Sequence, residues 1–127
     1  MPIPVIQSTA DGGTITVRIS SPNFPQTVAG KVWRYNADKT KDGAAGIFTS
    51  EAPDVPLGVP AQVDGKFYLV QGAVLHHNDN PPTPYQVVVT VRQGETVLHE
   101  AVPDNNGAGQ IGSEDIPFTY RFQMEVA

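Results

Sequence analysis

The chain contains no cysteine among its 127 residues, which excludes disulfide bonds, thiolate metal sites and cysteine nucleophiles together. Because small extracellular domains often depend on disulfides, this absence favours a reducing compartment. Long apolar runs are also missing, so no segment reaches the length of a membrane-spanning helix. A secretory signal peptide has a basic region followed by an apolar region. The segment "MPIPVIQSTADGG" has neither. We therefore expect a protein that is cytoplasmic, or exported without a classical signal peptide.

Positive charge is scarce, with 8 Lys and Arg against 13 Asp and Glu, a net charge of −5 and a sequence pI near 4.9. A nucleic-acid binder has to neutralise several backbone phosphates, so this balance makes nucleic acid an unexpected partner. The nearest approach to a basic cluster consists of Lys31, Arg34, Lys39 and Lys41, interrupted by Asp38 and Asp42. We interpret this cluster as a solvated face, with an anion site as the alternative.

Helical periodicity is absent as well: no window places apolar residues at helical spacing, and 12 prolines and 12 glycines punctuate the chain. Apolar residues make up 39% and charged residues 17%, which suits a folded domain. Short alternating segments separated by turn residues predict an all-β fold, an antiparallel β-sandwich of immunoglobulin-like or similar Greek-key architecture with about seven to nine strands. The length predicts one domain over residues 1–127.

Alternating apolar and polar residues predict the individual strands. The clearest runs over residues 118–126, where every second residue is apolar: Phe118, Tyr120, Phe122, Met124 and Val126. An early strand has Ile15, Val17 and Ile19 on one face. Upstream of the C-terminal strand, Tyr85, Val87, Val89 and Val91 share a face, and a turn at Gly94 leads into a return strand over 96–102. These patterns predict strands with one buried and one wet face.

Two further segments are less regular. In residues 28–35, Gly30 and the adjacent Val32 and Trp33 break strict alternation, which predicts a bulge or burial on both faces. We assign Trp33 to the core, with stacking on a sugar ring as the alternative. The dipeptide Asp64-Gly65 lies between two β-prone runs and predicts a hairpin with a primed turn before a long strand over 67–75.

The segment "DNNGAGQIGSED", residues 104–115, resembles the calcium loop of EF-hands in its spacing. Asp104, Asn106 and Asp115 fall at the first, third and last positions of that loop and are the candidate metal ligands. The match fails at Ala108 and Gly112, which offer no side-chain oxygen, and the predicted flanks are strands instead of helices. The segment is therefore no EF-hand. Calcium binding by its oxygens competes with a simpler interpretation, in which Asn, Asp and Gly only form local turns.

A second polar segment, "LHHNDNPPTPY", contains His76, His77 and Asp79, which are side chains of metal-binding type. Adjacent histidines on a strand point to opposite faces, so both could bind one metal only if the strand has ended by Leu75. Counting antiparallel strands from Phe67 onward places loops 76–84 and 103–115 at the same end of the molecule. We predict that this end binds a ligand, with His76, His77, Asp79, Asn105 and Glu114 as candidate contacts.

Enzymatic motifs are missing, including the Gly-x-Ser-x-Gly elbow, His-Glu-x-x-His, the P-loop and the dinucleotide fingerprint. The leading prediction is a non-catalytic binding module that recognises a protein or glycan through loops 76–84 and 103–115, with no cofactor except, in one version, calcium. The alternative is a structural subunit that forms a homo-oligomer through sheet edges such as the 118–126 strand. A small hydrolase-like enzyme is the third candidate.

Overall fold

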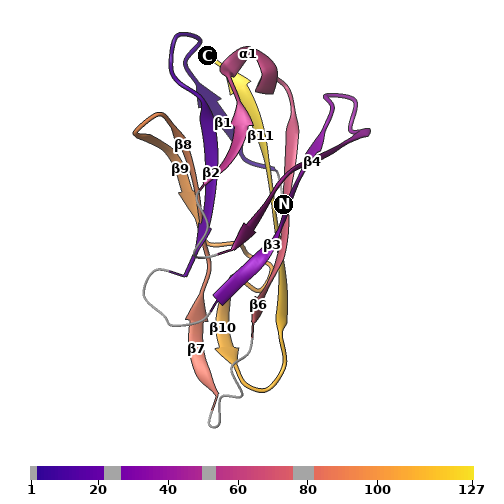
Figure 1. Ribbon diagram of the computed structural model, residues 1–127, viewed down its shortest axis with the longest axis vertical. Coiled ribbons are helices and arrows are strands. Elements are labelled where there is room, and N and C mark those ends of the chain that lie inside the picture. The colour runs from indigo at the N-terminus through magenta and orange to yellow at the C-terminus, as the bar shows by residue number, and fades with distance from the viewer. Residues whose placement is uncertain (1–2, 22–26, 50–53, 76–81) are drawn as a thin grey trace.

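A computed structural model describes residues 3–21, 27–49, 54–75 and 82–127, which form eleven strands and one short helix (Figure 1). In chain order the elements are β1 Val5–Ser8, β2 Ile15–Ser20, β3 Thr27–Tyr35, β4 Lys41–Thr49, β5 Val55–Gly58, α1 Pro60–Val63, β6 Phe67–Leu75, β7 Thr83–Gln86, β8 Val88–Gln93, β9 Thr96–Ala101, β10 Ala108–Ile111 and β11 Ile116–Val126. The protein is therefore all-β, as the sequence predicts. No helix in this part of the chain has the length and apolar character needed to cross a membrane.

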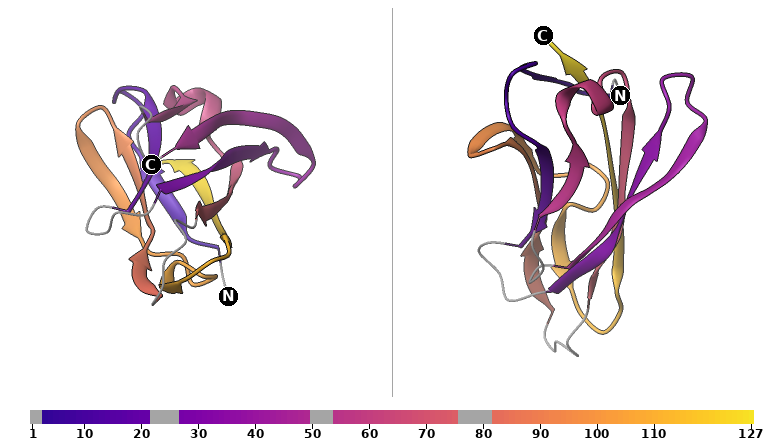
Figure 2. Two further views of the ribbon diagram at one scale, coloured as in Figure 1. Left: turned by 60° about the horizontal axis from the view of Figure 1, so that its bottom comes forward. Right: turned by 45° about the horizontal axis from the view of Figure 1, so that its top comes forward.

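The strands form three sheets, two of which are large (Figure 2). The five-stranded sheet has the order β1-β11-β6-β3-β4, the four-stranded sheet has the order β5-β2-β8-β9, and β10 pairs with β7 alone. Among the described strands, β1 runs parallel to β11 and every other pair is antiparallel. The long central pairing of β6 with β3 and β11 makes the five-stranded sheet the larger platform.

One hydrophobic core receives buried side chains from both large sheets. The five-stranded sheet contributes Val28, Val70 and Phe122, while the four-stranded sheet contributes Val17 and Val89, all at most 2% exposed. The alternation read from the sequence is confirmed for β2, where Ile15, Val17 and Ile19 are all buried. In β11 the predicted inward residues Phe118, Phe122 and Met124 are buried, while Tyr120 and Val126 are partly buried. In β8 Val89 and Val91 are buried as predicted, but so is Thr90 between them.

The strand count exceeds the predicted range of about seven to nine. The strands that the sequence does not predict are β1, β4, β5 and β10. Of these, β1, β5 and β10 span only 4 residues each, which leaves too short a pattern to recognise. The nine-residue β4 has its two large apolar residues, Ile47 and Phe48, side by side, so it shows no alternation. In addition, the single strand predicted around Tyr85 to Val91 divides at Val87, whose N–H donates to the carbonyl of Gly107 at 2.6 Å. The first part joins β10 and the second joins β2, so one apolar run serves two sheets.

The hairpin predicted at Asp64-Gly65 is wrong. The residues before it form α1, which begins at Pro60, a residue suited to the first helical turn because it has no N–H to leave unpaired. The preceding strand, β5, pairs with β2 in the other large sheet and not with β6. Gly65 does adopt a positive φ of 78°, and its N–H donates to Met124 of β11 at 2.9 Å. The positive φ that the sequence predicts at Gly65 is therefore present, but the turn belongs to the connection from β5 in one large sheet to β6 in the other.

The centre of the five-stranded sheet is packed so closely that two glycines pair across it. Gly30 of β3 lies opposite Gly72 of β6, and the ring of Phe48 covers both from the inner side. A Cβ on Gly72 would lie 2.6 Å from the carbonyl oxygen of Ala29 and 2.7 Å from Cζ of Phe48. Glycine is therefore required here by space, which holds β3 and β6 in close register.

The irregularity predicted near Val32 and Trp33 is confirmed in the pairing of β3 with β4, where the register shifts between those two residues. Against β6, however, β3 runs without a shift, so its side chains keep strict alternation. Val32 points inward and is fully buried, whereas Trp33 points outward and is partly exposed. The assignment of Trp33 to the core is wrong, because the bulge lies in the neighbouring strand and leaves the direction of Trp33 unchanged.

Candidate functional site

The two loops predicted to share one end of the molecule do meet in their described parts. Thr83–Gln86 pairs with Ala108–Ile111, so the end of the first loop lies directly beside the second (Figure 1). Three of the candidate contacts, His76, His77 and Asp79, lie outside the described residues. The described candidates are Asp104, Asn105, Asn106, Glu114 and Asp115, and all five are exposed.

The two asparagines of this loop are bonded into the fold. The Asn105 amide donates to the hydroxyl of Thr119 at 2.7 Å, and the Asn106 amide donates to the carbonyl of Pro117 at 2.9 Å. The carbonyl of Asn106 in turn accepts a hydrogen bond from the hydroxyl of Tyr85 at 2.9 Å. Asn106 has a positive φ of 62°, which an asparagine tolerates better than most residues. These contacts fasten the loop to β11 and β7.

The candidate calcium ligands do not form a cluster of acidic side chains. Among the residues the structure describes, no three His, Cys, Asp or Glu side chains are grouped so that they could hold one metal ion. Of the predicted ligands, Asn106 contributes its amide group to the turn, which supports the structural interpretation of that residue. Calcium binding at Asp104, Asn106 and Asp115 stays a prediction.

A second surface lies on the outer side of the five-stranded sheet, and we call it the cationic face. Its outward positions form three rows across β3, β6 and β11. The rows are Tyr35-Phe67-Gln123, Trp33-Leu69-Arg121 and Lys31-Gln71-Thr119. Lys39, in the turn after β3, and Lys41, the first residue of β4, complete the cationic face, because their ammonium groups lie over Phe67 and Trp33. It thus combines aromatic rings, amides and positive charges on one platform.

The only tryptophan of the chain is fixed at the centre of the cationic face. Its indole N–H donates to the side-chain oxygen of Gln71 at 3.0 Å. The ammonium of Lys41 lies 3.8 Å from the ring centroid, and that of Lys31 lies 5.3 Å away. Such cation–π contacts hold lysine side chains against a ring while leaving their charge in water. Trp33 is therefore an ordered, partly exposed ring surrounded by positive charge.

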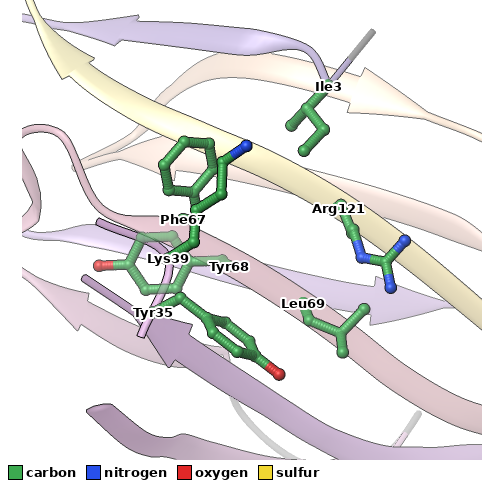
Figure 3. A pocket seen from close by; sticks show the side chains of 7 residues that line it. All are labelled: Ile3, Tyr35, Lys39, Phe67, Tyr68, Leu69 and Arg121. Atoms are coloured by element: carbon green, nitrogen blue, oxygen red, sulfur yellow. The ribbon is translucent and has the colours of Figure 1, made fainter. Parts of the chain in front are cut away.

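A shallow pocket of about 310 Å³ lies beside Trp33 on the same face (Figure 3). It is lined by Ile3, Tyr35, Lys39, Phe67, Tyr68, Leu69 and Arg121. The ring of Phe67 is partly covered by Lys39, whose ammonium lies 5.8 Å from the ring centroid. In Figure 3 the ammonium of Lys39 lies beside the ring of Phe67, and the guanidinium of Arg121 lies farther along the pocket, near Leu69. The pocket thus offers an apolar floor with positive charge at its rim.

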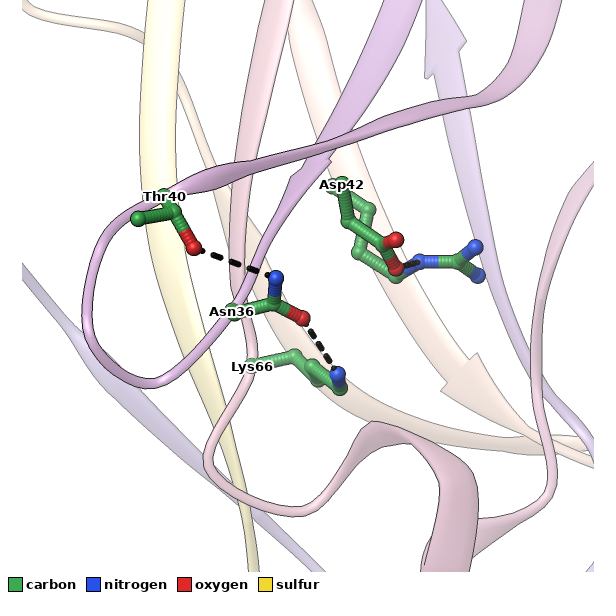
Figure 4. A network of polar contacts seen from close by, with 5 residues as sticks. Asn36, Thr40, Asp42 and Lys66 are labelled. Carbon is green, nitrogen blue, oxygen red and sulfur yellow. Dashed lines mark hydrogen bonds and ion pairs between the residues drawn. The ribbon is translucent and has the colours of Figure 1, made fainter.

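The acidic residues nearest in sequence to these lysines have partners of their own. Asp42 pairs with Arg34 at 2.7 Å (Figure 4). Asp38 accepts hydrogen bonds from both the N–H and the hydroxyl of Thr40. The bonds from Thr40 hold the pKa of Asp38 below its ordinary value. Within the described part of the chain, Lys31, Lys39, Lys41 and Arg121 form no ion pair within 4.0 Å. Their positive charges are therefore available to a ligand.

A smaller hollow of about 220 Å³ adjoins the cationic face and shares Ile3 and Arg121 with the first pocket. Asp104 and Tyr120 line it, and the Tyr120 hydroxyl lies 2.6 Å from Nε2 of His99. Burial lowers the pKa of His99, which favours the neutral imidazole. Burial, and then the charge of Asp104, raise the pKa of Tyr120. This pair of rings joins β9 to β11 across the edge of the core.

No protein-family model, no curated protein and no solved structure matches the chain. The function is therefore argued from the residues themselves. Sequence reasoning identified the lysines of the cationic face as a cluster, and Trp33 and Tyr35 as rings that could stack on a sugar, but it missed Phe67, Leu69 and Arg121. The available signal was parity, since Lys31, Trp33 and Tyr35 occupy alternate positions of one strand.

Proposed function

We propose that the protein is a non-catalytic binding module, built as an antiparallel β-sandwich, which recognises a glycan or protein through the cationic face. The observation that carries this proposal is the row of partly exposed aromatic side chains, Trp33, Tyr35 and Phe67, on a rigid sheet. Aromatic rings supply large contact areas at little cost in conformational entropy, and here their positions are fixed by the strands before any ligand arrives.

The cationic face is favoured over the end loops because its polar groups are less committed to the fold. The amides of Asn105 and Asn106 already donate hydrogen bonds to Thr119 and Pro117, so a ligand would have to displace those bonds. On the cationic face, Lys39 and Arg121 have exposed charges beside an apolar pocket. Pockets that combine an apolar floor with a few placed polar groups are the usual form of a binding site. Recognition through the loops stays the competing prediction.

Trp33 provides a direct test, because the chain's only tryptophan lies on the proposed surface. Titration with a panel of neutral and acidic oligosaccharides and peptides should give a saturable change in tryptophan fluorescence for at least one ligand. Tyr35→Ala and Phe67→Ala should each weaken that binding by about tenfold or more, since each removes a buried contact worth over about 1.4 kcal/mol. Circular dichroism would verify that both variants remain folded.

A matched control lies in the loop. Asn105→Ala should leave the affinity of the same ligand unchanged, because Asn105 is absent from the lining of the Tyr35–Phe67 pocket. If ligands bind, yet only the Asn105 substitution weakens them, the recognition surface is the end loop and the cationic face is excluded.

A second candidate function is assembly through sheet edges. Ile47 on the outermost strand β4 is 70% exposed, and Val97 on the outermost strand β9 is 50% exposed. Uncovered apolar edge strands are surfaces on which a second chain can pair. Light scattering at high protein concentration tests this function: a dimer that Ile47→Lys returns to monomer supports it. A monomer at every concentration excludes it.

A further inference from the structure

We propose that the pocket between Tyr35, Lys39, Phe67, Leu69 and Arg121 binds a sugar ring that bears a carboxylate or sulfate group. This inference rests on the proposed function, because it specifies the ligand of the same surface. It predicts that an acidic glycan, recognised one charged ring at a time, is the partner of the cationic face.

Positive charge is concentrated on the cationic face. The whole chain has 8 Lys and Arg and a net charge of −5, yet four exposed cations, Lys31, Lys39, Lys41 and Arg121, share the cationic face. Concentrating scarce positive charge on one surface of an acidic protein creates a local field that attracts anions. The overall negative charge would at the same time repel an acidic polymer from the rest of the surface. A single orientation of approach is the result.

The shape and lining of the pocket suit a sugar ring. Its volume of about 310 Å³ is at the small end of the range for ligand sites, which suits a short oligosaccharide segment better than a folded partner. Phe67, Leu69 and Tyr35 supply an apolar floor on which the C–H face of a sugar ring can rest. The exocyclic acid group of that ring would then lie at the rim, near Lys39 or Arg121.

The location of the pocket disfavours an acidic peptide. Peptides add to sheets by pairing with a free edge strand, but β6 is flanked on both sides by β11 and β3. An amphipathic helix requires a long apolar groove, whereas apolar lining here is confined to a few side chains between two cations. A ring-shaped ligand that lies flat on the sheet satisfies the geometry without using backbone hydrogen bonds.

The two rim cations have different chemical roles. Arg121 presents a planar guanidinium that can bind both oxygens of a carboxylate or sulfate in a fork. Lys39 is a point charge held near Phe67 by the cation–π contact at 5.8 Å. Arg121 should therefore determine the geometry of the acid group, while Lys39 contributes attraction with little directionality.

The test uses oligomers of a hexuronic acid, the same oligomers after chemical reduction of each carboxylate to an alcohol, a sulfated oligosaccharide and a polyglutamate peptide. Binding is followed by Trp33 fluorescence and by calorimetry. At least one acidic saccharide should bind about tenfold or more tightly than the reduced oligomer, because a hydrogen bond to a charged group is worth at least about 1.4 kcal/mol. Raising the salt concentration should weaken the binding of the acidic saccharide and leave the binding of the reduced oligomer unaffected.

Substitutions assign the effect to the pocket. Arg121→Gln and Lys39→Gln should each lower the affinity for the acidic saccharide by about tenfold. Arg121→Lys should recover only part of that affinity. Arg18→Gln is the matched control, since it removes the same charge from an exposed side chain on the four-stranded sheet, where Arg18 faces Asp54. It should leave the affinity unchanged.

The results distinguish the proposed function, which is binding at the cationic face, from the inference that its ligand is an acidic sugar. If the reduced and acidic oligomers bind equally well and Tyr35→Ala weakens both, the binding face is retained and the acidic-sugar inference is overturned. Preferential binding of polyglutamate at the same residues also overturns it. If the hexuronic and sulfated saccharides fail to bind while another ligand binds at the cationic face, only the inference fails. If no ligand in any panel depends on the cationic face, both proposals fail.

Discussion

The cationic face and the loop over residues 103–115 both display polar side chains but use them in different ways. In the loop, the amide of Asn105 donates to the hydroxyl of Thr119 and that of Asn106 to the carbonyl of Pro117, so both asparagines bind the loop to β11. On the cationic face, the strands satisfy their own backbone groups through the ladders, so the charged groups of Lys31 and Arg121 are left to point outward. The amides of the loop are thus occupied by the fold, whereas these charges on the sheet remain available.

This difference explains why the most motif-like segment of the sequence is the weaker candidate site. A loop rich in Asn, Asp and Gly resembles a ligand-binding segment because both require oxygen atoms and positive φ angles. In this chain Asn106 supplies the positive φ of 62° and the loop's hydrogen bonds together. Four sets of substitutions test this difference between the loop and the cationic face.

The largest effect is expected where the platform beneath the cationic face is most tightly packed. Gly72→Ala would place a Cβ 2.6 Å from the Ala29 carbonyl oxygen, which forces β3 and β6 apart. We expect the free energy of unfolding, measured by urea denaturation, to fall by about 3 kcal/mol. Gly13→Ala is the control, because its Cβ would meet no atom closer than 3.6 Å. Equal losses in the two variants would contradict the close packing of the platform.

The next effect belongs to the loop. Asn106→Ala should lower the free energy of unfolding by about 2 kcal/mol, because it removes the bond to Pro117 and places alanine at a positive φ of 62°. Asn106→Gly keeps the conformational freedom and should cost only about 1 kcal/mol, for the lost hydrogen bond. Both variants should bind the ligands of the cationic face normally. If either Asn106 variant is as stable as the unsubstituted protein but no longer binds those ligands, Asn106 serves recognition and not the fold.

Two tyrosines allow a hydroxyl with a hydrogen-bond partner to be compared with a buried hydroxyl that has none among the described residues. The Tyr85 hydroxyl donates to Asn106 in the loop, whereas the buried Tyr68 hydroxyl, beneath the cationic face, has no hydrogen-bond partner among the described residues. Tyr85→Phe should therefore lower the free energy of unfolding by about 1 kcal/mol, and Tyr68→Phe should leave it unchanged or raise it by up to about 1 kcal/mol. Thermal and urea unfolding measure both, and a loss in Tyr68→Phe would contradict the assignment.

The same pair predicts a dependence on alkaline pH. Burial raises the pKa of Tyr68 from 10.0 to about 12, so the folded state retains a proton that the unfolded chain releases above pH 10. The stability due to this difference is present below pH 10 and is lost as the pH rises from 10 to about 12. The loss approaches about 1.4 kcal/mol per pH unit. This component should be absent from Tyr68→Phe.

The smallest effect on stability is expected at the cationic face itself. Lys39→Gln and Arg121→Gln should change the free energy of unfolding by less than about 0.5 kcal/mol, because both side chains are exposed and unpaired within the described residues. Their expected loss of ligand affinity would then be a loss of recognition alone. A large destabilisation would show that these charges serve the fold, as the loop amides do.

Much of the fold is predictable because burial on one side of a strand produces a repeating pattern. The strands over 67–75, 96–101 and 116–126 match the predicted ones closely, and Gly94 turns with a φ of 60° where the sequence predicts it. Prediction fails where the pattern is too short or ambiguous. Four-residue strands such as β5 carry only two apolar positions, and the run that contains Val87 gives no sign of changing sheets.

The candidate site shows the same division. The lysine cluster is visible in the sequence, and so is the polarity of the loops, but nothing local relates Tyr35 to Phe67 or Leu69 to Arg121. Those pairs are separated by 32 and 52 residues and meet only through the cross-strand register. The bonds that occupy Asn105 and Asn106 likewise depend on the position of β11.

By itself, then, the sequence determined the all-β class, the burial of alternate residues and the polar character of the loops, because composition and period-two alternation act locally along the chain. Only the tertiary structure decided that Trp33 faces outward, that Pro60–Val63 is helical and that four scattered cations share one face. The physical reason is that sheet register and strand order are fixed by long-range packing, including the Gly30–Gly72 contact under Phe48.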